Sequence, residues 1–347
     1  MLVTGVGGRA VGHQILHALS YVKDAYRVVA ADMDRFSFGL YGVDRQYLIP
    51  AATAPNYREA MVRIVQKEGV AALLPGTEVE LPVLTAAAAE LSDAGCTVIA
   101  NPRPVVRRCQ DKAELHRWLS ENGVAGPRTV EARHWRDLIA EVGFPIVGKP
   151  RTGTGASRDV AILVDEAEVQ WYLERIPGGA ERAIFQEYVG DAESEYTVGV
   201  MVSRSGSVID SIALHRRLSG LSLGQERLVG GRRYAISTGY SQGYIVDHPE
   251  VRGQCEELAL RVGARGPLNV QLRFVEGRIR VFEVHPRFSG TTSIRADVGF
   301  NEPDVLIRHF VLGEECGRIP YRRDVAAIRA LQAVIVPVST MSAVPEA

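Results

Sequence analysis

Apolar positions in the first hundred residues fall into two kinds of pattern. Short apolar runs alternate with longer stretches in which apolar residues recur every three or four positions, the spacing of an amphipathic helix. We expect strands at 2–4, 26–32, 70–74 and 97–100, and helices at 11–19, 57–68 and 81–94. Strands that alternate with helices at these lengths predict a parallel sheet covered by helices. The segment Asn101-Pro-Arg-Pro104 then predicts a domain boundary, because proline restricts itself and the residue before it.

Beyond this boundary, several apolar runs alternate with polar residues and are joined by short turns. We expect helices at 111–122 and 135–142, and strands at 145–149, 160–164, 183–188, 197–202, 208–214, 268–274 and 279–284. Glu276-Gly277 predicts a hairpin turn between the last two, which indicates an α+β region with a largely antiparallel sheet. A further strand at 330–336 and a frayed polar tail are expected. The predicted units are 1–104, 105–190, 191–325 and 326–347.

Composition and charge exclude several classes of protein. The chain has 347 residues, of which 46% are hydrophobic and 23% charged, as is ordinary for a globular protein of two or three domains. Lys plus Arg total 40 against 41 Asp plus Glu, so no basic excess indicates a nucleic-acid or membrane-surface partner. Only four basic residues are lysines, at Lys23, Lys67, Lys112 and Lys149. This asymmetry raises the question of why lysine stands at these positions.

The cysteines and the N-terminus indicate the compartment. The four cysteines are scattered and form no CxxC motif, which predicts a reduced protein without a structural metal. The chain begins with Met1-Leu-Val-Thr-Gly5, with no basic segment before a long apolar core, so we expect no signal peptide. No apolar run approaches 18 residues, so we expect no transmembrane helix. These features predict a cytoplasmic protein with neither nucleic-acid nor membrane partners.

One candidate site lies at the first strand-to-helix turn. Gly5-Val-Gly-Gly-Arg-Ala10 matches the dinucleotide-binding pattern G-x-G-x-x-G/A, and Asp32 ends the second expected strand, where a ribose-binding acid belongs. This interpretation predicts an NAD(P)-dependent oxidoreductase. The alternative is that a tight turn needs small residues, since glycine tolerates positive φ and close backbone approach.

A second motif resembles a phosphate-binding P-loop but departs from it. Gly143-Phe-Pro-Ile-Val-Gly-Lys149 has the glycine and lysine, yet Pro150 stands where Ser or Thr should hold magnesium, and the intervening residues are strand-like. We therefore place Lys149 at the end of a strand, beside a nucleotide. The following segment, Arg151 to Ser157, is rich in glycine and hydroxyl groups and suits a loop that covers phosphates.

A third group of polar residues lies on the hairpin near the end of the pattern. Alternation with period two places Glu283 and His285 on one face of their strand, and Gln271 lies on the neighbouring strand. These side chains can converge on a metal ion. Arg287 follows directly, where it can neutralise a phosphoryl group.

Together these segments resemble the ATP-grasp superfamily, in particular its short ligases similar to carbamoyl phosphate synthase, over about residues 1–320. The resemblance rests on Gln110-Asp-Lys112, Gly143 to Pro150, Gln186-Glu-Tyr-Val189, Glu195-Tyr-Thr-Val198, Asn269-Val-Gln271 and Glu283 to Thr291, and on Leu74 to Pro82 in the N-terminal part. It implies a mixed α/β and α+β fold. A Rossmann-like domain, which typically binds no dinucleotide in this family, precedes an ATP-grasp fold of two α+β lobes.

The resemblance also implies roles for the nucleotide-binding residues. Those expected at the ATP phosphates are Lys112, Lys149 and the loop residues Gly153, Thr154, Gly155 and Ser157. Those expected at the adenine are Glu187, Tyr188 and Val189. Glu195 is expected at the ribose, with Glu193 as a competing candidate.

The remaining implied roles concern the metal and the acceptor. Gln271, Glu283 and His285 are expected at Mg²⁺, Arg287 at the transferring phosphoryl group, and Arg295 at the acceptor carboxylate or acyl phosphate. We expect the acceptor site to be bordered by His215, Arg216, Arg217, Ser289 and Gly290. The family usually has Asn where this chain has His285, which favours weaker metal binding, Mn²⁺, or contact with phosphate or substrate instead.

The resulting hypothesis is an ATP-dependent carboxylate–amine ligase. It would form an amide or peptide bond on a small amino acid or related metabolite through an acyl phosphate, giving ADP and phosphate. The sequence leaves open whether the nucleophile is an amine or a thiol, and whether the protein forms a homodimer. Two alternatives remain: the NAD(P)-dependent oxidoreductase, and an ATP-binding regulatory protein whose turnover is weak because of His285.

Overall fold

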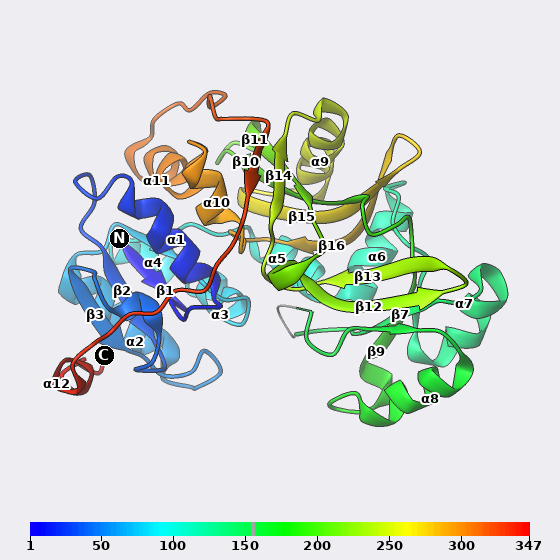
Figure 1. The fold of residues 1–347 in the computed structure, drawn as a ribbon. Coiled ribbons are helices and arrows are strands. Elements are labelled where there is room, and N and C mark those ends of the chain that lie inside the picture. Colours follow the sequence, from blue (N-terminus) through cyan, green and yellow to red (C-terminus); the bar gives the residue numbers. More distant parts are fainter. Residues whose placement is uncertain (154–156) are drawn as a thin grey trace.

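The computed structural model describes residues 1–153 and 157–347. The N-terminal part is a five-stranded parallel sheet in the order β3-β2-β1-β4-β5, with helices on both faces (Figure 1). Its strands are β1 (Leu2–Thr4), β2 (Val29–Asp32), β3 (Arg45–Leu48), β4 (Ala72–Leu74) and β5 (Thr97–Val98). Its helices are α1 (Val11–Ser20), α2 (Tyr57–Glu68), α3 (Leu81–Ala86) and α4 (Ala88–Asp93). Alternate strand residues face opposite sides: Val3 packs with the α1 cluster and Leu2 with the α2 cluster.

Two helices lead from this sheet into a small lobe. They are α5 (Arg103–Gln110) and α6 (Lys112–Glu121). The lobe is an antiparallel sheet in the order β6-β9-β7-β8, formed by β6 (Thr129–Glu131), β7 (Ile146–Pro150), β8 (Ala161–Leu163) and β9 (Ala183–Glu187). The helices α7 (Trp135–Val142) and α8 (Glu166–Arg175) share its apolar core.

The large lobe is an antiparallel six-stranded sheet in the order β16-β15-β10-β11-β14-β17. Its strands are β10 (Glu195–Val202), β11 (Val208–Arg216), β14 (Gly243–Val246), β15 (Gly266–Val275), β16 (Arg278–His285) and β17 (Val325–Ala327). A two-stranded ribbon, β12 (Leu223–Val229) and β13 (Arg232–Ser237), reaches from this lobe to the small one. The remaining helices are α9 (Pro249–Val262), α10 (Thr292–Asp297), α11 (Glu302–Leu312) and α12 (Val338–Ser342).

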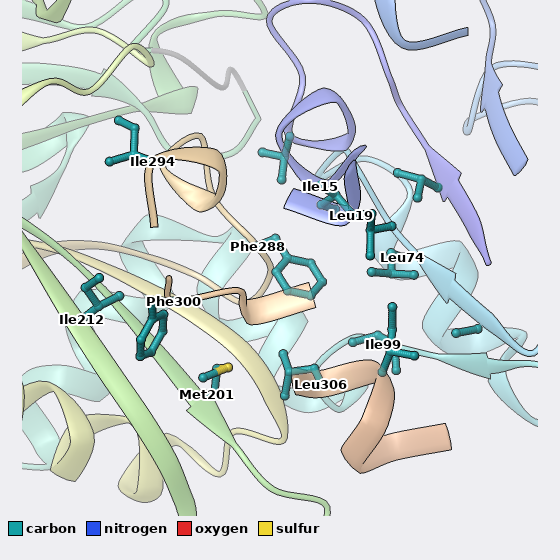
Figure 2. Packing of buried hydrophobic residues seen from close by; sticks show 14 of the residues in the cluster. Ile15, Leu19, Leu74, Ile99, Met201, Ile212, Phe288, Ile294, Phe300 and Leu306 are labelled. Atoms are coloured by element: carbon teal, nitrogen blue, oxygen red, sulfur yellow. The ribbon is translucent and has the colours of Figure 1, made fainter. Parts of the chain in front are cut away.

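The N-terminal part and the large lobe share one apolar core. Ile15 and Leu19 of α1 belong to the same buried cluster as Phe288, Phe300 and Leu306, which come from the segment around α10 and α11 (Figure 2). Polar contacts surround the cluster, such as the one from His17 Nε2 to Asp297 Oδ1 at 2.7 Å. This packing fixes the turns of the N-terminal sheet against the large lobe.

Some elements of the structure differ from those expected. The edge strand β3 was not expected, because only Tyr47 of its residues is buried and the others lack a strand-like apolar pattern. The helix expected at 81–94 is divided into α3 and α4 at Ala87. The strand expected at 330–336 is wrong: the segment forms neither a helix nor a strand, and Ile335 is 93% exposed.

The tail is also not frayed. Val344 is buried, the backbone N–H of Leu48 donates to Pro345 O at 2.8 Å, and Ala347 N donates to Leu48 O at 2.9 Å. Arg35 donates to the carbonyl groups of three residues of the tail. The C-terminus thus extends the β3 edge of the N-terminal sheet, which its composition alone does not reveal.

Candidate active site

A cavity lies between the small lobe, the ribbon and the β15–β16 hairpin. Its wall includes Val147 and Lys149 of β7, the segment after β9, and side chains of β13, β15 and β16. The predicted site residues on this wall are Lys112, Lys149, Ser157, Glu187, Tyr188, Val189, Glu195, Gln271, Glu283, His285, Arg287, Ser289 and Gly290. The structure therefore brings together residues that lie up to 178 positions apart in the chain, Lys112 to Gly290.

Lys112 and Lys149 are positioned by local structure. Asp111 caps α6 by accepting hydrogen bonds from Ala113 N at 3.0 Å and Glu114 N at 3.1 Å, and its carboxylate also binds Arg151 Nε at 2.9 Å. The cap sets Lys112 at the first turn of the helix. Lys112 N in turn donates to Arg151 O at 2.9 Å, which fixes the helix start beside the end of β7.

Lys149 is almost completely buried. Its Nζ donates to Phe282 O at 3.1 Å and has no carboxylate within ion-pair distance among the described residues. Burial, together with the nearby Lys112, lowers the pKa of Lys149 to about 7, against the opposing effect of Glu283. A buried, poorly neutralised cation of this kind favours an anionic ligand.

The segment after β9 is held by paired contacts. The backbone N–H of Glu187 donates to Arg128 O at 2.9 Å, and Arg128 N donates to the Glu187 carboxylate at 3.1 Å. The hydroxyl of Tyr188 both donates to Ala235 O and accepts from Ala235 N. The Tyr188 contacts tie the small lobe to the ribbon, and the Glu187 contacts hold the end of β9 beside Arg128.

Glu195, and not Glu193, faces the cavity. The Glu195 carboxylate is 2% exposed, and Arg216 Nη1 lies 3.1 Å from its Oε1. No described group donates a well-aligned hydrogen bond to Oε1, which leaves this buried acceptor available for a ligand hydroxyl. Glu193 is exposed and paired with Arg217 and Arg233 outside the cavity.

The β15–β16 hairpin brings the predicted metal residues together. Gln271 is the direct partner of Glu283 across the two strands. The Nε2 atoms of Gln271 and His285 lie 3.3 Å apart, and His285 Nε2 lies 3.4 Å from Glu283 Oε2. Lys112 Nζ approaches Glu283 Oε1 at 3.6 Å. Alternation along β16 therefore places these side chains on one face, as the sequence predicts.

An acid from the N-terminal sheet joins this group. Glu78, in the turn after β4, accepts a hydrogen bond from His285 Nδ1 at 2.7 Å and lies 3.6 Å from Arg287 Nη2. Burial alone would lower the pKa of His285, but Glu283 and Glu78 outweigh it and raise the pKa to about 9. Burial opposes ionisation of Glu78, yet Arg287 and His285 lower its pKa to about 2. His285 is thus an imidazolium between two carboxylates.

Two family models match the chain. A PylC-like N-terminal domain matches residues 1–99, and an ATP-grasp domain, described as belonging to a biosynthetic pathway with the Ter operon, matches residues 184–334. The carbamoyl phosphate synthase large chains of Halomonas eurihalina and Thermus thermophilus are 23% and 26% identical, each over 84% of this chain. The chain is therefore similar to the ATP-grasp superfamily, with the ATP-grasp family model matching residues 184–334.

The comparisons also define the extent of the similarity. The chain spans only 27% and 28% of the length of those two relatives. Among solved structures, the biotin carboxylase domain of Hydrogenobacter thermophilus 2-oxoglutarate carboxylase has a TM-score of 0.64 and 17% identity, covering 91% of this chain and 70% of that one. An L-amino acid ligase from Bacillus licheniformis has a TM-score of 0.61 and 16% identity, covering 89% and 73%. Both confirm the predicted ATP-grasp fold. No helix in the described ranges has the length and apolarity to cross a membrane.

Several predicted residues lie away from the ATP-grasp cavity. Gly153 is exposed and does not line it, and Thr154 and Gly155 lie outside the described residues. His215 stacks on Tyr196, and Arg217 pairs with Glu193 at the surface. Alternation along β11 explains the placement of His215, because Arg216 pairs inward with Glu195 and its neighbour in the strand points the other way, whereas Arg217 lies just beyond the end of β11.

Arg295 lies behind the wall of the cavity. It is 1% exposed, its Nη1 donates to Glu302 Oε1 at 2.8 Å, and its Nη2 donates to Asn269 Oδ1 at 2.7 Å. Asn269 lines the cavity and also accepts from Thr197 Oγ1 at 3.0 Å. In this arrangement Arg295 supports the wall through Asn269 rather than facing an acceptor.

Sequence reasoning missed several charged residues of the site, namely Arg9, Arg273, Arg280 and Glu78. Arg273 lies on β15 two positions after Gln271, donates to Val189 O at 2.8 Å and has its guanidinium carbon 4.1 Å from the centre of the Tyr188 ring. The alternation that placed Glu283 and His285 could have found it. Glu78 has no such signal, because its contacts with β16 depend on how the N-terminal sheet packs on the large lobe.

The Gly5–Ala10 turn is occupied by contacts within the chain. The Asp32 carboxylate, the predicted ribose acid of the dinucleotide alternative, accepts from Gly7 N and from Asp34 N, both at 3.1 Å. A Cβ at Gly5 would lie 2.4 Å from Thr77 Cγ2, so the loop after β4 fills the space beside the turn. These contacts favour a structural role for the glycines over dinucleotide binding.

Proposed function

We propose that this ATP-grasp chain ligates a carboxylate to an amine, using ATP and releasing ADP and phosphate. The observation that carries the proposal is the cavity itself, in which Lys112, Lys149 and Arg287 face the carboxylates of Glu283 and Glu195. Three cations beside a buried acceptor suit a nucleotide triphosphate and its ribose. The 2-oxoglutarate carboxylase structure contains MgADP, and the L-amino acid ligase is named for the chemistry proposed here.

The cations have a direct role in such a reaction. A carboxylate is a poor acyl donor until phosphoryl transfer from ATP converts it into an acyl phosphate. The transition state spreads negative charge over the transferring group, and fixed cations in a site shielded from water stabilise that charge. Lys149 and Lys112 are placed for the phosphates of the nucleotide, and Arg287 for the transferring group or for the oxyanion formed when the amine attacks.

The residues present fit Mg²⁺, although not as a set of three protein ligands. Among the described residues, no group of three His, Cys, Asp or Glu side chains is arranged around a metal. Mg²⁺ commonly takes one or two carboxylates, with waters and substrate phosphates completing its shell. Glu283 and the amide oxygen of Gln271 meet that need, whereas protonated His285 does not coordinate. When bound, Mg²⁺ supplies positive charge at the β- and γ-phosphates. Mn²⁺ is an alternative to Mg²⁺ at this site.

A panel of carboxylates and amino-acid pairs tests the proposal. Phosphate release is measured with ATP and Mg²⁺ for the wild type, Lys149→Arg and Glu283→Ala, with Lys67→Arg as the matched control on an exposed helix position. We expect substrate-dependent release that Lys149→Arg reduces at least tenfold and Lys67→Arg does not. Tight ATP binding without release for any pair would contradict the ligase.

One observation favours a second candidate, an ATP-binding regulatory protein with weak turnover. His285 is held between Glu78 and Glu283 and so occupies part of the metal region. Under this candidate, the wild type binds ATP but releases no phosphate with any substrate pair, and His285→Asn should raise that release. We also propose that the chain forms a homodimer, because the 2-oxoglutarate carboxylase domain of similar fold was solved as a dimer. Equilibrium sedimentation tests this, and a monomer at micromolar concentration would contradict it.

A further inference from the structure

One group of cavity residues has no part in the nucleotide assignments above. It consists of Arg9, Val11, Thr238, Gly239, Ser289 and Gly290. The Arg9 guanidinium carbon lies 5.8 Å from the centre of the ring of Tyr240, the residue after Gly239, and a Cβ at Gly290 would lie 3.0 Å from Gly239 O. Because only Phe288 separates Ser289 from Arg287, this group lies next to the residue assigned to the transferring phosphoryl group.

The glycine-rich turn holds Arg9 at the rim of the cavity. Asp32 binds the backbone of Gly7, Ala10 N donates to Gly7 O at 2.8 Å, and Gly39 N donates to Val6 O at 2.9 Å. These bonds fix the turn on both sides of Arg9. The motif that suggested a dinucleotide therefore positions a cation at the ATP-grasp cavity.

Arg9 differs from the other arginines of the cavity wall, and from Lys112, in having no carboxylate partner among the described residues. Each of those has a carboxylate partner: Arg273 with Glu195, Arg280 with Glu187, Arg287 with Glu78, and Lys112 with Glu283. Arg9 forms no ion pair with any residue in the ranges that the structure describes, and its one close partner is the Tyr240 ring.

A second arginine adds positive charge behind the same group. Arg329 donates to Gln14 Oε1 at 3.1 Å, to Ser241 O at 2.9 Å and to Gly290 O. All three acceptors are neutral, and no carboxylate of a described residue lies within ion-pair distance of Arg329. The Ser289–Gly290 wall is therefore flanked by two arginines, Arg9 and Arg329, neither of which has an ion-pair partner among the described residues.

We propose that Arg9 binds a second anionic group of the acid substrate, in addition to the carboxylate that is activated. The substrate class is then a dicarboxylate, or an acid that also carries a phosphate or phosphonate. This inference rests on the proposed ligase function and narrows its substrate. A planar guanidinium with two parallel N–H donors suits either anion.

The test measures binding separately from turnover. Protein saturated with Mg²⁺ and a non-hydrolysable ATP analogue is titrated calorimetrically with acids matched in chain length: butanoate, succinate and 3-phosphonopropionate, and then pentanoate and glutarate. Arg9→Gln removes the charge at an exposed position, and Arg45→Gln is the control, because Arg45 is also exposed and lies on β3 away from the cavity.

We expect at least one dianionic acid to bind ten times more tightly than its monocarboxylate match, and Arg9→Gln, but not Arg45→Gln, to abolish that difference. A preference for phosphonate over dicarboxylate would identify the second anion as a phosphate. Equal binding within every matched set, or a preference that survives Arg9→Gln, would overturn the inference. The proposed function fails by a different result, namely no binding of the ATP analogue or no acid-dependent ADP formation in the same preparation.

Discussion

Nucleotide binding should take up a proton at Lys149. The structure buries this ammonium beside Lys112 and lowers its pKa to about 7, so at pH 8 about 10% of the free protein carries the proton. The charged form is the one that attracts phosphate. A bound nucleotide should restore a pKa well above 8, so binding should take up about 0.9 proton at that pH.

The sign of the pH dependence follows from this difference. Below pH 7 the free protein already holds the proton, so the affinity for nucleotide should be nearly independent of pH. Above pH 7 the proton must be acquired on binding, so the association constant should fall by up to tenfold per pH unit, about 1.4 kcal/mol. The fall should continue until pH reaches the pKa of Lys149 in the complex.

Calorimetric titration of an ATP analogue at pH 8, in buffers of different ionisation enthalpy, measures the proton uptake. Lys149→Met removes the titrating group, and Lys149→Arg keeps a charge that does not titrate in this range. Both variants should lose the uptake of nearly one proton, whereas Lys67→Arg should retain it. Wild-type uptake below about 0.2 proton, or unchanged uptake in Lys149→Met, would refute the assignment of a buried titrating lysine.

Three further predictions concern stability and the metal. Glu302→Gln leaves Arg295 buried without its counter-charge. The free energy of unfolding, measured by urea denaturation, should therefore fall by about 3–5 kcal/mol. A fall of less than about 1 kcal/mol would argue against a buried ion pair. Phe288→Ala should lower the free energy of unfolding by about 3–5 kcal/mol, because it opens a cavity in the core shared by the N-terminal sheet and the large lobe. A variant as stable as the wild type would show that Phe288 does not pack in such a core. His285→Asn should lower the Mg²⁺ concentration for half-maximal phosphate release, because an imidazolium is replaced by an oxygen donor; an unchanged requirement would show that His285 lies outside the metal's influence.

For residues of a single strand, the sequence predicted which side chains share a face. Alternation placed Glu283 and His285 on one face of β16, and the hairpin brought Gln271 opposite Glu283. The same rule turns His215 of β11 away from the side on which Arg216 lies. Two of the four lysines, Lys112 and Lys149, line the cavity, where a compact point charge and a planar guanidinium are not equivalent.

Contacts between distant elements were not predictable in this way. Glu78 meets His285 across 207 positions because the N-terminal sheet shares a core with the large lobe. The apolar segment at 330–336 has the composition of a strand, yet it pairs with no strand, while the tail beyond it docks on β3. In each case the outcome depends on which surfaces meet, and no local pattern encodes that.

Isotope transfer tests the central claim most directly. An acid that stimulates ADP formation is labelled with ¹⁸O in its carboxylate, and the phosphate released is examined by mass spectrometry. Activation as an acyl phosphate predicts that one carboxylate oxygen leaves with each phosphate, so every phosphate should carry one ¹⁸O atom, diluted only by unlabelled acid. Phosphate that contains no label, with the amide product still formed, would contradict the account.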